Sequence, residues 1–350
     1  MAVGVIESGT TGRWDWKRLE LGSAWAEVIP GRGGIVTQWE IEERGRRLPL
    51  LWLCSGYHDW GLDEPRRLGG GIPILFPTCG PTASAGQEGR YLVGDRPCIM
   101  PNHGFAAWMP WEIVEEVAEE DEAAIAVSLK DTPETHKCYP FSFQTIVRYT
   151  LRERSLRIGW TCENLSEAPM PIAPGLHPYY RVPFTRKAQR GDMQIITTAQ
   201  TRFFQDEPVR VWNGKTEPLK SGRIQLGDLP SGRPTTIGDC VTPEYSLVDP
   251  ASGLTLRATW PASIQPLRPL RPLRPAQNRP AQGRQAQDGP SGEGTGPYLN
   301  LWTPDEQTPA YCVEPFLGLQ NALNHRRGLI EIAAGNKWEW WFEMEILGAD

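Results

Sequence analysis

The sequence has no apolar run long enough to cross a membrane and no sign of a secretory leader. Its first twenty residues, MAVGVIESGTTGRWDWKRLE, include acidic side chains and lack an apolar core. No later run approaches the ~18 apolar residues of a membrane span. The seven cysteines are odd in number and contain no Cys-x-x-Cys pair, which argues against a disulfide framework and a zinc site. We therefore expect a reduced, cytoplasmic protein that does not span a membrane.

The chain also has fewer positively than negatively charged side chains. The chain has 36 Lys and Arg against 42 Asp and Glu, for a net charge of −6. This balance argues against nucleic acid or an anionic membrane surface as the main partner, and a neutral small molecule fits better. The Gly-rich stretch 69–80, GGGIPILFPTCG, has no Lys-Ser/Thr after its glycines and no helical pattern, so it does not indicate a nucleotide-binding loop.

Alternating apolar residues dominate the chain, and no long amphipathic helix is evident. Residues 24–41 read as two β-runs split by a Gly-rich turn, and 49–54 as a short buried strand. Residues 141–151 and 156–162 predict a long antiparallel hairpin, and 337–347 a closing strand with one apolar face. Although 350 residues would allow two average domains, we predict one large all-β antiparallel domain over 1–350.

One stretch breaks this pattern. Residues 261–297 hold eight prolines and five arginines, with Pro-Leu-Arg three times in succession from Pro266. Such a composition buries too little apolar surface to order itself, so we predict a disordered insertion between two strands. A role in binding a peptide or an anionic partner is the alternative.

Two residues far apart in the sequence are candidates for acid–base chemistry. His177 lies in PIAPGLHPYYRVP, where flanking prolines fix the backbone and Tyr179 offers a ring and a hydroxyl to a polar, ring-shaped ligand. Glu314 lies in YCVEPF, where we expect a strand end beside a cleft and a pKa raised by burial. The alternative for His177 is a buried structural histidine, and these residues alone do not place the pair together.

A second histidine stands in an aromatic loop. In PNHGFAAWMPW, His103 offers a hydrogen bond to a sugar hydroxyl, and the ring of Phe105 is suited to stacking on the apolar face of a sugar. A loop that is simply packed on the core explains these residues equally well.

Four stretches in order, GGGIPILFPTCG, NHGFAAW, ENLSEAPMPIAPGLHPYY and YCVEPF, resemble the aldose 1-epimerase (galactose mutarotase) family, especially its hexose-6-phosphate mutarotase branch. The likeness spans about residues 24–347 without the insertion. It implies a β-supersandwich with a broad sugar cleft. It also implies interconversion of the α and β anomers of a sugar, with Glu314 as general base, His177 as general acid and His103 holding the ring oxygen or a neighbouring hydroxyl. No metal or cofactor is implied.

The sugar-binding aspartate and the phosphate ligands are less well marked. Asp239 is the candidate for the aspartate, with Asp249 or Asp206 as alternatives. Arginines that are common in the sugar-phosphate branch are replaced by Gly69 or Gly70 and by Ala107, although Arg66, Arg67 or Arg90 are possible substitutes. We therefore favour an unphosphorylated aldohexose, and keep the sugar phosphate as the alternative.

Two further readings come from other functional classes. A carbohydrate-binding protein without catalysis would use the same cleft, and a scaffold protein would act through the insertion. The presence of both His177 and Glu314 favours catalysis. We expect a sugar as the partner of a monomer or homodimer, with no nucleic acid and no membrane.

Overall fold

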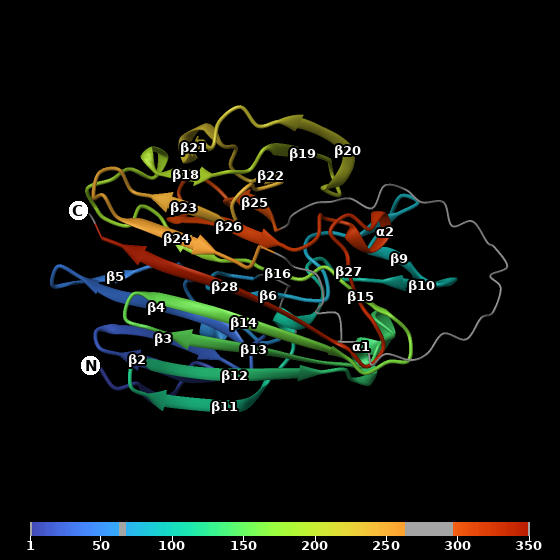
Figure 1. Cartoon of the computed structure of the whole chain (residues 1–350), viewed down its shortest axis with the longest axis horizontal. Coiled ribbons are helices and arrows are strands. Elements are labelled where there is room, and N and C mark those ends of the chain that lie inside the picture. Colours follow the sequence, from blue (N-terminus) through green and yellow to red (C-terminus); the bar gives the residue numbers. More distant parts are fainter. Residues whose placement is uncertain (1, 63–67, 263–296, 349–350) are drawn as a thin grey trace, which may run out of the picture.

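A computed structural model describes residues 2–62, 68–262 and 297–348. Almost all of its regular structure is β-strand, which confirms the predicted all-β class (Figure 1). Within the described residues the helices are short: α1 spans Pro133–Cys138, α2 spans Ala322–His325, and single 3-10 turns cover Tyr57–Asp59, Ala106–Trp108, Arg190–Asp192 and Leu226–Asp228. None of these helices has the length and apolar character needed to cross a bilayer. The predicted insertion at 261–297 lies almost entirely outside the described residues.

The N-terminal residues form a five-stranded antiparallel sheet. Its strands, in spatial and sequence order, are β1 (Val5–Thr11), β2 (Trp14–Leu21), β3 (Ala24–Ile29), β4 (Ile35–Glu43) and β5 (Arg46–Pro49). The predicted hairpin over 24–41 is β3 and β4, joined by the Gly-rich turn. Residues 49–54 differ from the prediction: beyond β5 they form isolated bridges, Leu51 with Tyr180 and Leu53 with Gly70, instead of a continuous strand.

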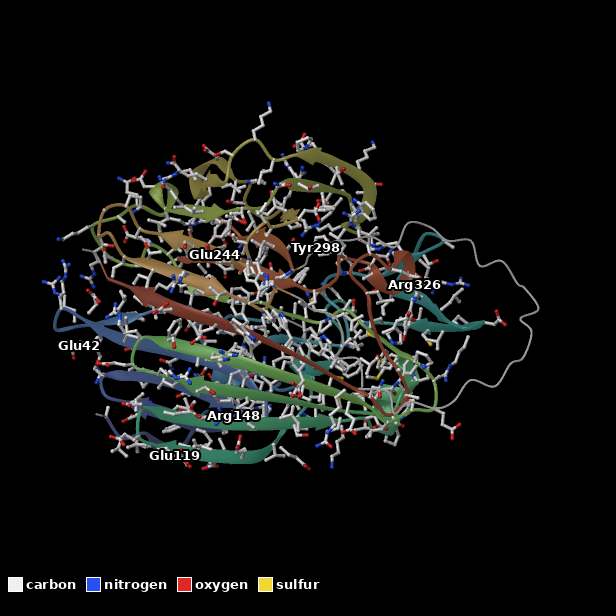
Figure 2. The ribbon with its side chains drawn as sticks, viewed as in Figure 1. Glu42, Glu119, Arg148, Glu244, Tyr298 and Arg326 are labelled. Carbon is white, nitrogen blue, oxygen red and sulfur yellow. The ribbon has the colours of Figure 1, made fainter. Side chains whose placement is uncertain are left out.

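The largest sheet in the described part of the chain has nine strands. In spatial order it contains β11 (Glu112–Glu119), β12 (Glu122–Lys130), β13 (Phe143–Leu151), β14 (Ser155–Asn164), β28 (Lys337–Leu347), β24 (Thr255–Thr259), β23 (Glu244–Val248), β18 (Gln194–Thr197) and β21 (Arg223–Gln225). The predicted hairpin is β13 with β14, and the predicted closing strand is β28, which lies between β14 and β24. The sheet carries ion pairs at its surface, such as Arg148 with Glu115 and Glu122. Figure 2 labels Arg148 among the side chains of this sheet.

An eight-membered sheet carries the candidate site. Its order is β20 (Val211–Pro218), β19 (Thr201–Asp206), β22 (Thr235–Gly238), β25 (Tyr298–Trp302), β26 (Ala310–Phe316), β16 (Gly175–Leu176) and β6 (Ile74–Leu75), and β17 (Tyr179–Arg181) also pairs with β26. Three small pairs complete the fold: β7 (Ala83–Ser84) with β8 (Gln87–Glu88), β9 (Arg90–Val93) with β10 (Arg96–Ile99), and β15 (Met170–Ile172) with β27 (Ile330–Ile332).

The sheets pack face to face around one large core. Tyr149 of the nine-stranded sheet donates a hydrogen bond to the carbonyl of Gly34, in the turn between β3 and β4 of the five-stranded sheet. The hydroxyl of Tyr245 in the nine-stranded sheet donates to the carbonyl of Val313 in β26, 3.2 Å away. One face of β26 thus packs against buried aromatic side chains of the nine-stranded sheet. A side chain on the other face of β26 points toward the cleft described next.

Candidate active site

Glu314 lies inside β26, in the middle of the eight-membered sheet. Its side chain is fully buried. The sequence placed it at the end of a strand, but the strand continues through Pro315 to Phe316. Proline is tolerated here although it lacks an N–H, since the chain on the β16 side pairs with β26 only in short pieces.

Strand pairing brings His177 opposite Glu314. Gly175 in β16 pairs with Phe316, and Tyr179 in β17 pairs with Cys312. His177 stands midway between these two pairing points, and Glu314 stands midway between their partners on β26. Strand pairing within one sheet therefore brings together two groups that lie 137 residues apart in the sequence.

The two side chains meet at the floor of a cleft. His177 Nε2 lies 3.2 Å from Glu314 Oε2, and both residues are buried. No hydrogen bond is formed by Glu314 Oε2 or by His177 Nδ1 to the described residues. Because a buried polar atom without a partner is costly, these two atoms are ready to bind polar groups of a ligand.

Burial moves both pKa values away from their ordinary ranges. Burial raises the pKa of Glu314 well above its usual value, opposed by the hydrogen bond from Asn300. Burial, and to a lesser degree the proximity of His103, lowers the pKa of His177 well below its usual value. The two shifts favour the neutral forms of both groups, with the carboxyl protonated and the imidazole uncharged.

His103 is fixed beside the pair as a neutral hydrogen-bond donor. Its Nδ1 accepts a hydrogen bond from the backbone N–H of Gly80 at 3.1 Å, so the proton of the neutral ring is on Nε2. Burial lowers the pKa of His103 to about 4. Its ring centroid lies 5.5 Å from that of His177. The residue adopts a left-handed backbone with φ of 63°, which is uncommon outside glycine and often marks a functional position.

A network of amides orients Glu314. Asn300 pairs across the strands with Glu314 and donates from Nδ2 to its Oε1 at 2.9 Å. The oxygen of Asn300 accepts in turn from Thr236 and Gln320, at 3.0 and 3.2 Å. Gln205 also donates to Thr236, at 2.7 Å. Sequence analysis missed these residues; the signal was Asn300 in an otherwise apolar strand, but its partner depends on strand register.

The cleft above the pair holds about 740 Å³ of space that opens to solvent. Its walls mix rings and polar side chains, which suits a hydroxylated ring. Tyr179 stacks on His177 with centroids 4.6 Å apart and planes within 10°, and Trp302 stands edge-on to both rings. The lining residues are Leu68, Gly80, Pro81, Asn102, His103, His177, Tyr179, Gln205, Arg210, Pro234, Asn300, Trp302, Glu314, Phe316 and Gln320.

Phe105 does not line this cleft. Its ring packs in the core against Phe76 and stacks on Phe143. It supports the His103 loop from below, which is the core-packing alternative considered from the sequence.

None of the three candidate aspartates lines the described cleft. Asp239 lies 3.8 Å from Arg327, Asp206 accepts a hydrogen bond from Asn213 near the surface, and Asp249 is fully buried as a cap of the turn after β23.

Of the three arginines proposed as phosphate ligands, Arg90 is the one that the structure describes, and it does not line the cleft. Arg90 lies on β9 and bonds to Gln87, while Arg66 and Arg67 lie outside the described residues. The cation that does line the cleft is Arg210, which sequence analysis missed.

A metal ion is the other ligand that this geometry could accept. His177, Cys312 and Glu314 offer three ligand atoms within 4.8 Å of one another. Binding there would occupy both the imidazole and the carboxylate that the acid–base pair needs, so the two uses exclude each other.

The fold and the site together define a β-sandwich protein with a buried His–Glu pair under an open cleft lined by rings and polar side chains. The profile of the family described as aldose 1-epimerase matches residues 19–222, more than half of the chain. The chain belongs to the aldose 1-epimerase family.

Relatives in sequence match over a limited stretch. A protein of Escherichia coli K12 named "Putative glucose-6-phosphate 1-epimerase" is 30% identical over 139 residues, which is 38% of this chain and 38% of that protein. The chromosomal protein LacX of Lactococcus lactis is 31% identical over 136 residues, 38% of this chain and 44% of LacX. The aligned stretch thus spans less than half the length of either relative.

Solved structures match over nearly the whole chain. The Slr1438 protein of Synechocystis sp. PCC 6803 superposes with a TM-score of 0.73 at 23% identity, covering 98% of this chain and 99% of that one. A galactose mutarotase-like protein of Clostridium acetobutylicum gives a TM-score of 0.76 at 17% identity, covering 99% of both chains. At these identities the likeness establishes the fold, which is the β-sandwich expected from the sequence.

Proposed function

We propose that this protein is an aldose 1-epimerase that interconverts the α and β anomers of an aldohexose. The observation that carries the proposal is the approach of His177 Nε2 to within 3.2 Å of Glu314 Oε2 at the floor of the cleft. A mutarotase needs one group that takes a proton from the anomeric hydroxyl and one that gives a proton to the ring oxygen, and this approach puts both groups at one place in the cleft.

The reaction would proceed through the open-chain sugar. Glu314 takes the proton of the anomeric hydroxyl while His177 gives a proton to the ring oxygen, so the bond between C1 and the ring oxygen breaks and an aldehyde forms. Rotation about the C1–C2 bond presents the other face of the aldehyde. The ring hydroxyl then adds to C1, returns its proton to His177, and the new anomeric oxygen takes the proton held by Glu314. Protons and electrons balance without a cofactor.

The neighbouring side chains would position the sugar for these transfers. His103 Nε2–H is placed to donate to the ring oxygen or the adjacent hydroxyl, because its Nδ1 is engaged by Gly80. Tyr179, stacked on His177, limits rotation of the imidazole. Asn300 holds one oxygen of Glu314 and leaves the other facing the cleft. Asp239 remains a weaker proposal as a sugar ligand, since it lies beside Arg327 and outside the cleft lining.

The test is the rate of anomer exchange of glucose and galactose, measured by polarimetry or exchange NMR. We expect the native protein to accelerate exchange and both Glu314→Gln and His177→Asn to lose about 10²–10⁴-fold. Glu27→Gln is the matched control, since Glu27 is a buried carboxylate bonded to Thr37 far from the cleft. A native protein that accelerates no free or phosphorylated hexose would contradict catalysis and favour a protein that only binds sugar.

A second candidate is a hexose-6-phosphate mutarotase. Arg210 lines the cleft and offers a guanidinium to a phosphate. Two relatives carry the name glucose-6-phosphate 1-epimerase. Comparing kcat/KM for glucose and for glucose 6-phosphate separates the two candidates.

A cytoplasmic location is also a proposal. All seven cysteines are described, and none forms a disulfide. Cysteines that form no disulfide are usual in a reducing compartment.

A further inference from the structure

Two glutamines line the cleft, and the proposed proton transfers use neither of them as a ligand of the sugar. Gln205 lies in β19, and Gln320 lies in the turn that precedes α2. Gln205 is partly buried, and only 2% of Gln320 is exposed. Because buried amides need partners, the hydrogen bonds of these two side chains show what they have left for a ligand.

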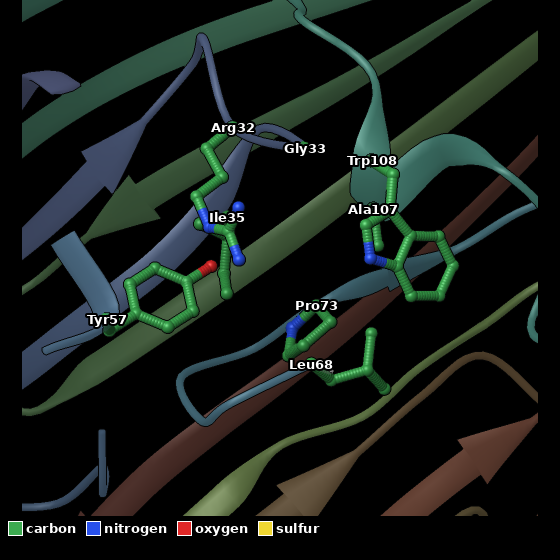
Figure 3. A pocket seen from close by; sticks show the side chains of 8 residues that line it. All are labelled: Arg32, Gly33, Ile35, Tyr57, Leu68, Pro73, Ala107 and Trp108. Carbon is green, nitrogen blue, oxygen red and sulfur yellow. The ribbon is translucent and has the colours of Figure 1, made fainter. Parts of the chain in front are cut away.

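The two glutamines belong to the cleft and not to the smaller pocket beside it. Leu68 lines both spaces, and Figure 3 shows the side chains around the smaller one, where Arg32 lies over the ring of Tyr57. Gln205 and Gln320 line only the cleft. A ligand that contacts them therefore lies in the same space as the acid–base pair.

Thr236, buried in β22, fixes the orientation of both amides. Its hydroxyl donates its one proton to Asn300 Oδ1, 3.0 Å away, so Thr236 Oγ1 can only accept further hydrogen bonds. It accepts from Nε2 of Gln205 at 2.7 Å and from Nε2 of Gln320 at 3.0 Å. An amide turned the other way would place two acceptor oxygens against each other. The nitrogen of each glutamine is therefore held at Thr236.

Gln320 has both of its donors engaged and keeps a free acceptor. Besides its bond to Thr236, Nε2 donates to Asn300 Oδ1 at 3.2 Å, so both N–H groups have a partner. Its Oε1 is buried and accepts no hydrogen bond from the described residues. A buried carbonyl oxygen without a donor destabilises the empty site, and a hydroxyl group of a ligand would satisfy it.

Gln205 offers a second acceptor in the same cleft. Its Nε2 is held by Thr236, and its Oε1 accepts no hydrogen bond within the described part of the chain. A carbonyl oxygen accepts hydrogen bonds and donates none. This pair of oxygens therefore matches the O–H donors of a hydroxylated ring and not the oxygens of a phosphoryl group.

We propose that Gln205 and Gln320 each bind a hydroxyl group of the substrate by accepting a hydrogen bond on Oε1, and that Thr236 positions them to do so. The proposal rests on the proposed function, because that function makes the ligand a sugar. A site built around such acceptors rejects an analogue that lacks the matching hydroxyl, since a buried oxygen is then left without a partner.

Monodeoxy glucoses test these contacts one hydroxyl at a time. The 2-, 3-, 4- and 6-deoxy sugars keep the anomeric hydroxyl and the ring oxygen, so each can still exchange anomers. We expect the native kcat/KM of two of them to be lower than that of glucose by about 10-fold or more. In Gln320→Met, the kcat/KM of glucose should fall to about that of one deoxy sugar, whose own value stays unchanged. Gln205→Met should do the same for a different hydroxyl.

The readout is the ratio of kcat/KM for glucose to that for the deoxy sugar. A variant that only disturbs Glu314 or the fold slows all the sugars alike and leaves this ratio where it was. Gln144→Met is the matched control, because Gln144 also donates from Nε2 to a hydroxyl, Ser128 Oγ at 3.1 Å, but lies in β13 outside the cleft. Thr236→Val should lower both ratios, and Thr236→Ser, which keeps the hydroxyl, should retain them.

Two results would overturn the proposal. One is a native kcat/KM that is the same for glucose and for every monodeoxy sugar. The other is a loss in Gln205→Met and Gln320→Met that is equal for all the sugars, which would leave the glutamines a structural role only.

Failure of the mutarotase function would be recognised separately, as a native protein that accelerates none of these sugars. Their dissociation constants, measured by calorimetry, then carry the same comparison. Discrimination against two deoxy sugars in binding, lost in the two Met variants, would support the glutamine contacts while contradicting catalysis. Absence of binding to any of the sugars would overturn both.

Discussion

At the scale of residues, the candidate site depends on two groups that burial pushes in opposite directions. The pKa of Glu314 is raised and that of His177 is lowered, so the neutral forms of both are favoured where an exposed pair would form an ion pair. A sugar that supplies hydroxyls to the unpartnered atoms would stabilise the charged forms when they are needed. We therefore expect proton transfer to depend on substrate binding.

The pH profile of glucose exchange should reflect these shifts. Burial lowers the pKa of His103 to about 4 and that of His177 well below its usual value, so neither ring gains a proton near pH 6.5 as an exposed histidine would. The pKa of Glu314, the proposed base, is raised, so we expect kcat/KM, corrected for the buffer rate, to fall as the pH drops through that raised value, with no further fall from the histidines until about pH 4. A profile that stays flat down to the ordinary pKa of a glutamate would contradict the raised pKa of Glu314.

Glu314→Gln should make the protein more stable at neutral pH while it abolishes activity. The folded-state pKa of Glu314 is raised above the unfolded value near 4.3, so its ionisation costs stability as the pH rises above that value. A glutamine removes this cost and can still accept from Asn300. We expect a gain on the order of 1 kcal/mol at pH 7 that disappears below pH 4, measured by denaturant unfolding. Lower stability of the variant at pH 7 would contradict the assignment.

Sequence reasoning pointed to cleft residues whose type and local motif suggest chemistry. It missed residues whose place in the cleft depends on strand pairing. His177, Glu314, His103 and Tyr179 all line the cleft, as expected from residue type and local motif. Asn300 was missed because an amide in a strand has no local signal; its role comes from facing Glu314 across the sheet. The aspartate could not be chosen from sequence, since that choice depends on which loop reaches the cleft.

At the scale of elements, β26 is the strand that builds the site. It carries Glu314 and pairs on one side with β25, which supplies Asn300 and Trp302, and on the other with β16 and β17, which flank His177. A shift of one residue in this pairing would turn Glu314 to the opposite face of the sheet. The register of three strand pairings therefore sets the catalytic distance.

Gly175 allows the backbone of β16 to lie close against β26. A Cβ atom at this position would lie 2.5 Å from the carbonyl oxygen of Pro315 and 2.6 Å from Cys79 Sγ. We expect Gly175→Ala to cost about 1–3 kcal/mol of stability and to reduce anomer exchange, because His177 is displaced with β16.

Thermal unfolding and exchange rates, measured on the same samples, check this prediction. Gly159→Ala is the control: it lies in β14, and its Cβ would meet no atom closer than 3.8 Å. Equal effects of the two substitutions would argue against a special role for Gly175.

Strands with a strong alternation of apolar residues were predicted from the sequence. Strands that depend on pairing with their neighbours were not. β28 buries every second side chain, as its sequence indicated. β1, with the sequence VIESGTT, is mostly exposed and has few apolar residues; it is held by pairing with β2 and by Ile6, which packs on the core. Residues 49–54 are apolar enough for a strand, but they contact two neighbours alternately and form no continuous ladder.

At the scale of the whole molecule, the segment between β24 and β25 should be dispensable. From composition we predict that 263–296, which lie outside the described residues, take no part in the core. Replacing them with a short Gly-Ser linker should leave anomer exchange within about 2-fold of native and the melting temperature nearly unchanged, because loop length contributes little to closure entropy. A folded deletion variant without activity would assign the segment a role in the site.

The topology as a whole could not be worked out from periodicity. Alternation predicted one antiparallel β domain, but β24 lies in the nine-stranded sheet and β25, the next described strand, lies in the eight-membered one. Which strands are neighbours across such a break depends on long-range packing. The resemblance to a known family, and not the local pattern, supplied that part of the prediction.

Glu314 lies on β26, and His177 lies between two strands that pair with β26. This placement also determines how long the site stays assembled. Neither group is carried by a lid or a hinge among the described residues, so the geometry opens only when β26 separates from its neighbours. Amide hydrogens of β26 should exchange with deuterated water at the rate of global unfolding. Catalytic competence would then be lost and regained together with the fold, with no long-lived inactive native form between.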